Sequence, residues 1–348
     1  MTAVSTRPAP APTVASVRAR VRSRRILVVT AVLLSLVVVA AISLSVGDYA
    51  LAPADLWRTI WGGGARIESY VVFQLRAPRL SMAIVAGAAL GVSGALLQSL
   101  LSNPLASPDL LGISGGAGVA AVFGILVLGI TGPFLAVVAF VGGLVVAAFL
   151  LLAGSRRGDG EYRLVVAGIG VAFLCVAITG YLMTRAQVEL AQAALIWLTG
   201  SLASTPWWNV AVVLIVSVVA LPAILACARW LPLTQLGAGT AVSLGVRPDA
   251  VRIVTVVVAV LLTSTTCAFV GPISFIALCA PAIARPLLGH GAVAIGTSAA
   301  VGALLLAGAD LIAQYAVPGI SLPVGVVTGA LGAVFLLWLL TTSKGRQL

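Results

Sequence analysis

Apolar stretches long enough to cross a lipid bilayer recur along almost the whole chain, separated by short polar breaks. A helix needs about 20 mostly apolar residues to cross the hydrocarbon core. Charged residues make up only 8% of the chain, so it cannot present the solvated surface of a soluble domain. The sequence therefore predicts an all-α, polytopic membrane protein. We expect ten spans, over residues 26–46, 76–101, 108–128, 133–154, 163–185, 207–228, 251–270, 272–288, 291–313 and 322–341.

The distribution of basic residues orients these spans. An even number of spans places both termini on one side of the membrane, and short cytoplasmic loops carry an excess of Lys and Arg. With the N-terminus inside, 15 of the 20 basic residues are cytoplasmic and five are outside. The sequence thus predicts that both termini are cytoplasmic. The net charge of +11 follows from this bias and does not indicate nucleic-acid binding.

The predicted domain organisation is simple, because no soluble domain fits between the spans. Residues 1–25 are rich in Pro, Ala and Arg and are expected to form a disordered cytoplasmic tail. The alternative is the charged region of a secretory signal, but the apolar run that follows is longer than a typical signal core. Residues 26–341 form one transmembrane domain, and 342–348 form a second cytoplasmic tail. The apolar segment 191–204 is too short to span and is predicted to be an interfacial or re-entrant helix on the outer face.

The residues needed for several kinds of chemistry are missing from the sequence. Lys344 is the sole lysine and no G-x-x-x-x-G-K-[ST] motif is present, so the chain has no P-loop for ATP hydrolysis. His290 is the only histidine, and four scattered cysteines show no metal-ligand spacing. Asp109 and Asp310 lie near the ends of expected spans, which disfavours an ion-coupled carrier with an acid at mid-membrane. We therefore expect no catalytic site, metal or cofactor in this chain.

Several motifs are more specific than composition. The segment 76–117 reads RAPRLSMAIVAGAALGVSGALLQSLLSNPLASPDLLGISGGA, and WLTGS, SLGV, GPISFIALCAPAIAR and LPVGVVTGALG follow in order. Together they resemble the permease subunits of the iron-chelate and vitamin B12 uptake family of ABC importers, which have the type II importer fold. The resemblance covers about residues 26–341. It implies ten helices, two permease subunits around a central path, two cytoplasmic ATPases that bind ATP and Mg²⁺, and an extracytoplasmic binding protein.

The chain departs from the family pattern at four positions. Ala282 stands where members commonly have a histidine, and Ala277 where they have a glycine. Gln314 replaces an arginine that many members have after Asp-x-x-Ala, and Ser321 replaces an acid before the final LPxG motif. Gln314 can donate a hydrogen bond but cannot pair as a charge, so it differs in this respect from the arginine of other members.

The resemblance implies that Arg76, Arg79 and the position of Gln314 contact acidic residues of the binding protein. Two arginines around a proline present donors whose fork geometry suits carboxylates. The alternative is that both arginines extend from a helix end to the membrane interface.

The segment at about 231–250 resembles the family's pair of short coupling helices, which sit in a groove of the ATPase. An amphipathic loop on lipid headgroups is the alternative. The expected coupling residues are Gly239, Ser243, Leu244, Gly245 and Val246.

The translocation path in this family is lined by the fifth and tenth helices, which places Gly168, Gly170 and Thr179 as candidates here. The most common cargo in the family is a ferric siderophore, with haem and cobalamin as alternatives that the sequence does not separate. The sequence is thus interpreted as a multi-pass inner-membrane permease that forms a homodimer or pairs with a similar subunit. An ion-coupled secondary carrier is the alternative from another class.

Overall fold

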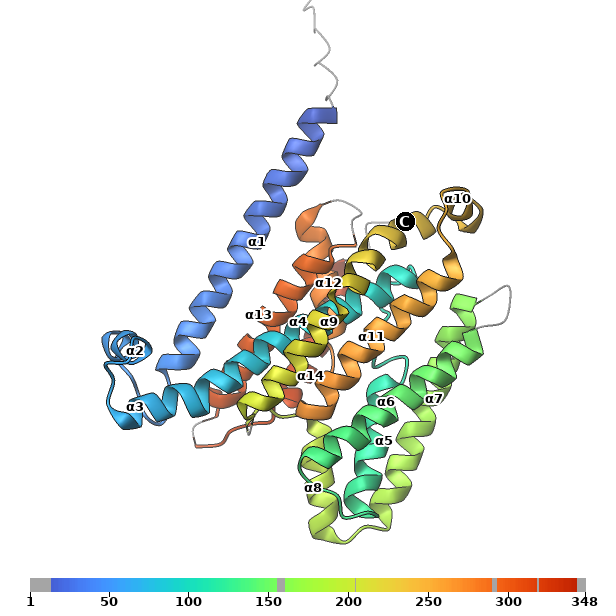
Figure 1. Cartoon of the computed structure of the whole chain (residues 1–348). Helices are drawn as coiled ribbons and strands as arrows, with labels where there is room; N and C mark the ends of the chain where they lie inside the picture. Colours follow the sequence, from blue (N-terminus) through green and yellow to red (C-terminus); the bar gives the residue numbers. More distant parts are fainter. Residues whose placement is uncertain (1–13, 155–159, 204, 290–292, 318, 343–348) are drawn as a thin grey trace, which may run out of the picture.

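The computed structural model describes residues 14–154, 160–203, 205–289, 293–317 and 319–342. These residues form a bundle of helices, and the described ranges contain no β-strand (Figure 1). The helices are α1 (Val14–Ser45), α2 (Pro53–Ile60), α3 (Arg66–Tyr70), the π-helix η1 (Val71–Arg76), α4 (Ala77–Leu100), α5 (Ile113–Leu126), α6 (Pro133–Gly154), α7 (Gly160–Thr184), α8 (Val188–Thr199), α9 (Trp207–Thr234), α10 (Ala238–Ser243), α11 (Pro248–Val270), α12 (Ile276–Leu288), α13 (Ile295–Tyr315) and α14 (Val324–Thr342).

Each of the ten expected spans contains one helix, namely α1, α4–α7, α9 and α11–α14. Within the described residues, seven helices are long and apolar enough to cross a membrane. The other apolar helices, α5, α8, α12 and the described part of α14, are shorter. The all-α membrane fold is therefore confirmed, whereas the count of ten spans and their orientation stay predictions.

α5 and α12 begin later than the expected spans, because buried, irregular backbone precedes each of them. Gly112 precedes α5 with φ 75°, and Phe275 precedes α12 with φ 70°. Such left-handed backbone cannot continue a right-handed helix. The neighbouring residues Leu111 and Ile273 are buried. Irregular backbone at membrane depth is tolerated where protein covers it, as it does here.

The chain differs from the sequence prediction at two more places. α1 begins at Val14, so residues 14–25 of the expected disordered tail are helical, while 1–13 lie outside the described residues. The expected coupling loop at 231–250 is shorter, since α9 runs to Thr234 and α11 begins at Pro248. One short helix, α10, lies between them. The interfacial segment expected at 191–204 is helical as α8, which ends before Gly200.

α4 is the central helix, and it packs against α9, α11, α12 and α13. Its glycines allow this close approach. A Cβ atom on Gly87 would overlap the backbone of Gly302 in α13, and one on Gly94 would overlap Ala277 in α12. Small residues serve this purpose in membrane bundles, where lipid provides no hydrophobic drive for helices to associate.

The two ends of the bundle carry different elements. Figure 1 shows α2 and α3 at the lower left and α10 at the upper right, with α4 running between these two ends. α5, α6, α7 and α8 form a group at the lower right, and α1 lies along the left edge against α13. The loops that join the helices therefore bring distant parts of the chain together at each end.

Candidate docking pocket and coupling loop

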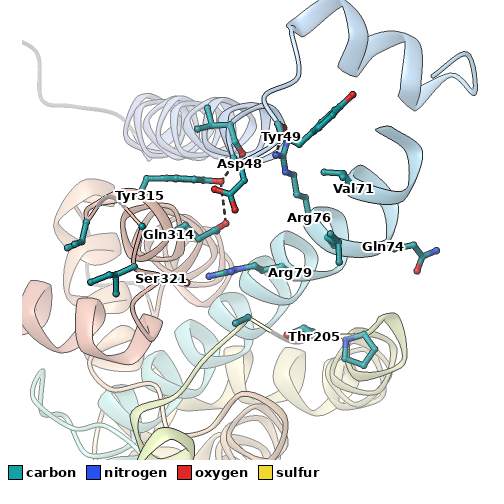
Figure 2. A pocket seen from close by; sticks show the side chains of 18 residues that line it. Asp48, Tyr49, Val71, Gln74, Arg76, Arg79, Thr205, Gln314, Tyr315 and Ser321 are labelled. Carbon is teal, nitrogen blue, oxygen red and sulfur yellow. Dashed lines mark hydrogen bonds between the residues drawn. The ribbon is translucent and has the colours of Figure 1, made fainter. Parts of the chain in front are cut away.

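A pocket of about 1160 Å³ opens at the end of the bundle that carries α2 and α3. It lies between the end of α1, η1, the start of α4 and the end of α13 (Figure 2). The segments before α9 and α14 complete its wall. All three residues predicted to dock a binding protein, Arg76, Arg79 and Gln314, line this pocket. The structure thus brings together residues that lie far apart in the sequence.

Arg79 forms a two-pronged ion pair with Asp310, which joins α4 to α13. The Arg79 Nη2 lies 2.8 Å from Asp310 Oδ1, and its Nε lies 3.0 Å from Oδ2. Gln314 also donates to Asp310, from Nε2 to Oδ2 at 2.8 Å. The Asp310 side chain is 3% exposed and that of Arg79 is 16% exposed. One carboxylate therefore neutralises Arg79 at the pocket wall, and two side chains share its oxygens.

Arg76 plays a different part in the same pocket. Its Nη1 donates to Leu44 O at 2.7 Å, and its Nη2 donates to Tyr49 O at 2.6 Å. These bonds hold the end of α1 and the segment after it against η1. No carboxylate pairs with Arg76 in the described part of the chain, so its positive charge stays available at the pocket. Docking by Arg76 and Arg79 stays a prediction, but the two arginines are not equivalent.

The hydrogen-bond pattern of the π-helix η1 stops at Pro78. Ala77 donates its N–H to Val72 O, five residues back, and the next donor in that pattern would be Pro78. Proline has no N–H, so Phe73 O is left without a helical partner. The indole Nε1 of Trp207 fills this position, donating to Phe73 O at 2.8 Å. π segments are frequent at functional sites, and this one carries Arg76 at its end.

Sequence reasoning missed several pocket residues. Asp48, Tyr49 and Tyr315 all line the pocket. The Tyr315 hydroxyl donates to Val46 O at 2.7 Å, which ties α13 to the chain just after α1 (Figure 2). No motif marks these residues, because Asp48 and Tyr49 lie in the loop after α1 and Tyr315 is the last residue of the apolar helix α13. Only the folded chain places them together.

α10 forms the turn at the opposite end of the bundle. Gly237 before it and Gly245 after it have φ values of 102° and 80°, which L side chains rarely adopt. These turns place Leu236, Val242 and Leu244 on the surface, 62%, 61% and 55% exposed. Exposed apolar residues gathered on one short loop are typical of a surface that another protein covers.

The five predicted coupling residues do not all lie on this surface. Gly239, Ser243, Leu244 and Gly245 are exposed, whereas Val246 is buried. The Ser243 hydroxyl donates to Thr240 O within α10 at 2.8 Å. A Cβ atom added to Gly239 would meet nothing within 4 Å, so there is open space beside this position of α10. Val246 therefore anchors the loop and the other four face outward.

A chain of hydrogen bonds ties this loop to the bundle. Gln235, at the end of α9, donates from Nε2 to Ser99 O at 2.9 Å. Arg285 of α12 donates from Nη2 to the Ser99 hydroxyl at 2.9 Å. The last turn of α4 thus links the entry to α10 with α12. Arg285 ends the motif GPISFIALCAPAIAR, but no motif predicts its contact with Ser99.

The structure separates the three candidates for the translocation path. Gly168 is buried against Leu111, which lies in the segment before α5. Gly170 is exposed and an added Cβ there would meet nothing within 4 Å. Thr179 is partly exposed. Gly168 thus packs against another segment of the chain, and the path assignment stays a prediction for all three residues.

Comparison with known proteins finds relatives that match almost the whole chain. The chain is 39% identical over 326 residues to the ferric enterobactin transport system permease protein FepG of Escherichia coli, covering 93% of this chain and 99% of the relative. It is 37% identical to the Fe(3+) dicitrate transport system permease protein FecD of Escherichia coli, over 83% of this chain and 91% of that one. It is 34% identical to the Fe(3+)-citrate import system permease protein YfmE of Bacillus subtilis, over 94% and 98%.

A solved structure and a family model complete the comparison. The fold is similar to that of a structure described as a metal-chelate type ABC transporter in an inward-facing conformation, with TM-score 0.81 and 24% identity over 90% of this chain and 98% of that one. The model of the FecCD transport family matches residues 33–342. The extent of this match and the identity to FepG show that the chain belongs to the FecCD transport family.

Proposed function

We propose that this chain is the transmembrane permease subunit of an ABC importer that carries a bulky ferric chelate. The observation that carries the proposal is the placement of two surfaces at opposite ends of one bundle. The arginine pocket lies at one end, and the exposed apolar residues of α10 lie at the other. An importer needs such an arrangement, because it receives its ligand on one side of the membrane and energy on the other.

The proposed partners are those that the resemblance to the importer family implies. This chain has no P-loop, so two cytoplasmic ATPase subunits would supply ATP hydrolysis with Mg²⁺, and α10 is the surface for them. The pocket with Arg76 is the surface for an extracytoplasmic binding protein. A second permease subunit, identical or similar, would complete the path. In this proposal the chain is a non-catalytic, multi-pass protein of the inner membrane with both termini in the cytoplasm.

The proposed cargo is a ferric siderophore. Support comes from the relatives, which are named for ferric enterobactin and ferric citrate transport. Haem and cobalamin are the alternatives within the same class of importer. The test is uptake of radiolabelled ferric enterobactin, ferric citrate, haem and cobalamin by cells that lack their own permeases, with this chain supplied and its ATPase present or deleted. We expect uptake of a ferric chelate that requires the ATPase.

Gly239→Arg tests the coupling surface most cleanly. Gly239 lies in α10, has no positive φ and has open space around it, so the variant adds bulk and charge without backbone strain. We expect transport to stop and copurification of the ATPase to fall at least about tenfold. This is the size of effect expected when one hot-spot residue of a protein interface is lost. Gly296→Arg is the control, since Gly296 is also exposed with open space around it, near the start of α13. Normal transport by Gly239→Arg would overturn the coupling assignment.

The docking surface has its own test. Arg76→Gln should weaken binding-protein affinity at low salt, because Arg76 has no carboxylate partner in the described residues and its charge is free to pair. Arg66→Gln is the control, an exposed arginine in α3 that does not line the pocket. Equal affinity for both variants would assign Arg76 to structure alone.

Uptake that survives deletion of the ATPase but stops when the proton gradient collapses would replace the importer with an ion-coupled carrier.

A further inference from the structure

The first turns of α1 carry a dense group of arginines with no acidic residue near them in sequence. Arg20, Arg22, Arg24 and Arg25 are all exposed, and the first acidic residue in the chain is Asp48. Because this segment is a helix, the arginines are held at defined positions around one axis rather than in a disordered tail. Their shared charge makes this segment a candidate for binding an anion.

The contact of Arg24 with α12 fixes where these arginines lie along the length of the bundle. Arg24 donates from Nε to Leu287 O at 2.8 Å and from Nη2 to Pro286 O at 3.2 Å. These carbonyls belong to the last turn of α12, which marks the inner end of the bundle. Arginine at a helix C-terminus also satisfies carbonyls that have no helical partner. α1 therefore continues past the end of α12, as Figure 1 shows at the top of the view.

The next residues along α1 place the membrane boundary. Ile26 and Leu27 are 56% and 69% exposed, although both are large and apolar. Such residues on a membrane-spanning helix face lipid tails. Arg25 directly precedes Ile26 and Leu27. Charged side chains and side chains that face lipid tails therefore lie within one turn of the helix. Arginines at this depth lie at the level of the lipid headgroups.

The arginines other than Arg24 are free to bind a ligand. No hydrogen bond or ion pair of the Arg20, Arg22 or Arg25 side chain occurs within the described residues. Arg22 is two residues from Arg24, which places it on nearly the opposite side of the helix from α12. Arg25 follows Arg22 by three residues, so these two lie on neighbouring positions of one face. That face points away from the bundle, toward the surrounding bilayer.

We propose that Arg22 and Arg25 bind the phosphate groups of anionic phospholipids in the cytoplasmic leaflet. The proposal rests on the orientation given under the proposed function, with the N-terminus inside. Guanidinium groups bind phosphate oxygens through paired donors, and anionic lipid attracts basic residues that lie just outside a span. The ATPase is the alternative occupant, and the test below distinguishes the two.

The test measures lipid binding to the purified full-length chain by native mass spectrometry, with phosphatidylglycerol and phosphatidylcholine of the same acyl chains. Each arginine near an anionic surface contributes about fivefold in affinity. Arg22→Gln with Arg25→Gln should thus bind phosphatidylglycerol about 25-fold more weakly, with phosphatidylcholine unchanged. Arg66→Gln with Arg185→Gln removes the same charge from the opposite end of the bundle and should leave binding near wild type.

Three outcomes would overturn the proposal. The first is equal affinity for the two lipids in the wild-type chain, and the second is equal loss in the two double variants. The third is unchanged lipid binding by the α1 variant together with lost copurification of the ATPase, which would assign the surface to that partner. The measurement needs no cargo, ATP or binding protein. Failure of the proposed transport function would therefore be seen separately, in the uptake assay.

Discussion

Replacing Arg79 by alanine is expected to destabilise the protein more than replacing Asp310. Removing one partner of a buried ion pair costs about 3–5 kcal/mol, because the other charge stays buried without compensation. In Arg79→Ala the carboxylate of Asp310, 3% exposed, keeps only the hydrogen bond from Gln314. The full range of about 3–5 kcal/mol applies to this variant.

Asp310→Ala has a smaller expected cost, because the Arg79 side chain is 16% exposed and lines an open pocket. Its guanidinium can turn toward water, so the loss is that of hydrogen bonds to a charged group, about 1.5–3 kcal/mol. Replacing both residues by apolar ones, Arg79→Met with Asp310→Leu, leaves no buried charge. Such replacements are often neutral in free energy. The double variant should therefore be more stable than Arg79→Ala.

The assay is unfolding of the purified chain in detergent, followed by tryptophan fluorescence. The free energies of Arg79→Ala, Asp310→Ala and the variant that carries both alanine substitutions are compared in a double-mutant cycle. We expect an interaction energy of about 1–3 kcal/mol between the two sites, as for residues in direct contact. Additive losses would mean that Arg79 and Asp310 do not interact in the protein. That result would refute both the ion pair and the argument that Arg79 is neutralised at the pocket.

Two further perturbations test the packing and the link to α10. Gly94→Ala should cost about 1–3 kcal/mol in unfolding free energy, because the new methyl group overlaps Ala277. Gly170→Ala has open space and should be neutral or slightly stabilising, so equal effects in thermal unfolding would contradict the packing argument. Gln235→Ala removes the hydrogen bond to Ser99 and should lower transport severalfold while the ATPase still copurifies. Unchanged uptake would show that transport does not depend on this hydrogen bond between α10's entry and α4.

Hydrophobic pattern predicted most of the fold, and its errors have a common cause. The apolar runs correctly indicated helices, because each span must satisfy its own backbone within lipid. The pattern placed α5 and α12 too early, since Leu111 and Ile273 are as apolar as helical residues but lie in irregular, buried backbone. Composition alone also predicted a disordered start where α1 is already helical.

Local sequence determined which residues stand at helix ends, and tertiary structure decided what they contact. Pro78 predicts an interruption in hydrogen bonding near Arg76, yet only folding shows that Trp207 fills the free carbonyl of Phe73. Arg79 predicts a partner for its charge, but Asp310 is 231 residues away in the chain. Periodicity and composition act over a few turns of one helix, whereas these contacts depend on how glycine-rich faces set the spacing between helices. For that reason the class and family of this protein follow from its sequence. The hydrogen bonds and the ion pair around its pocket follow from how the helices pack.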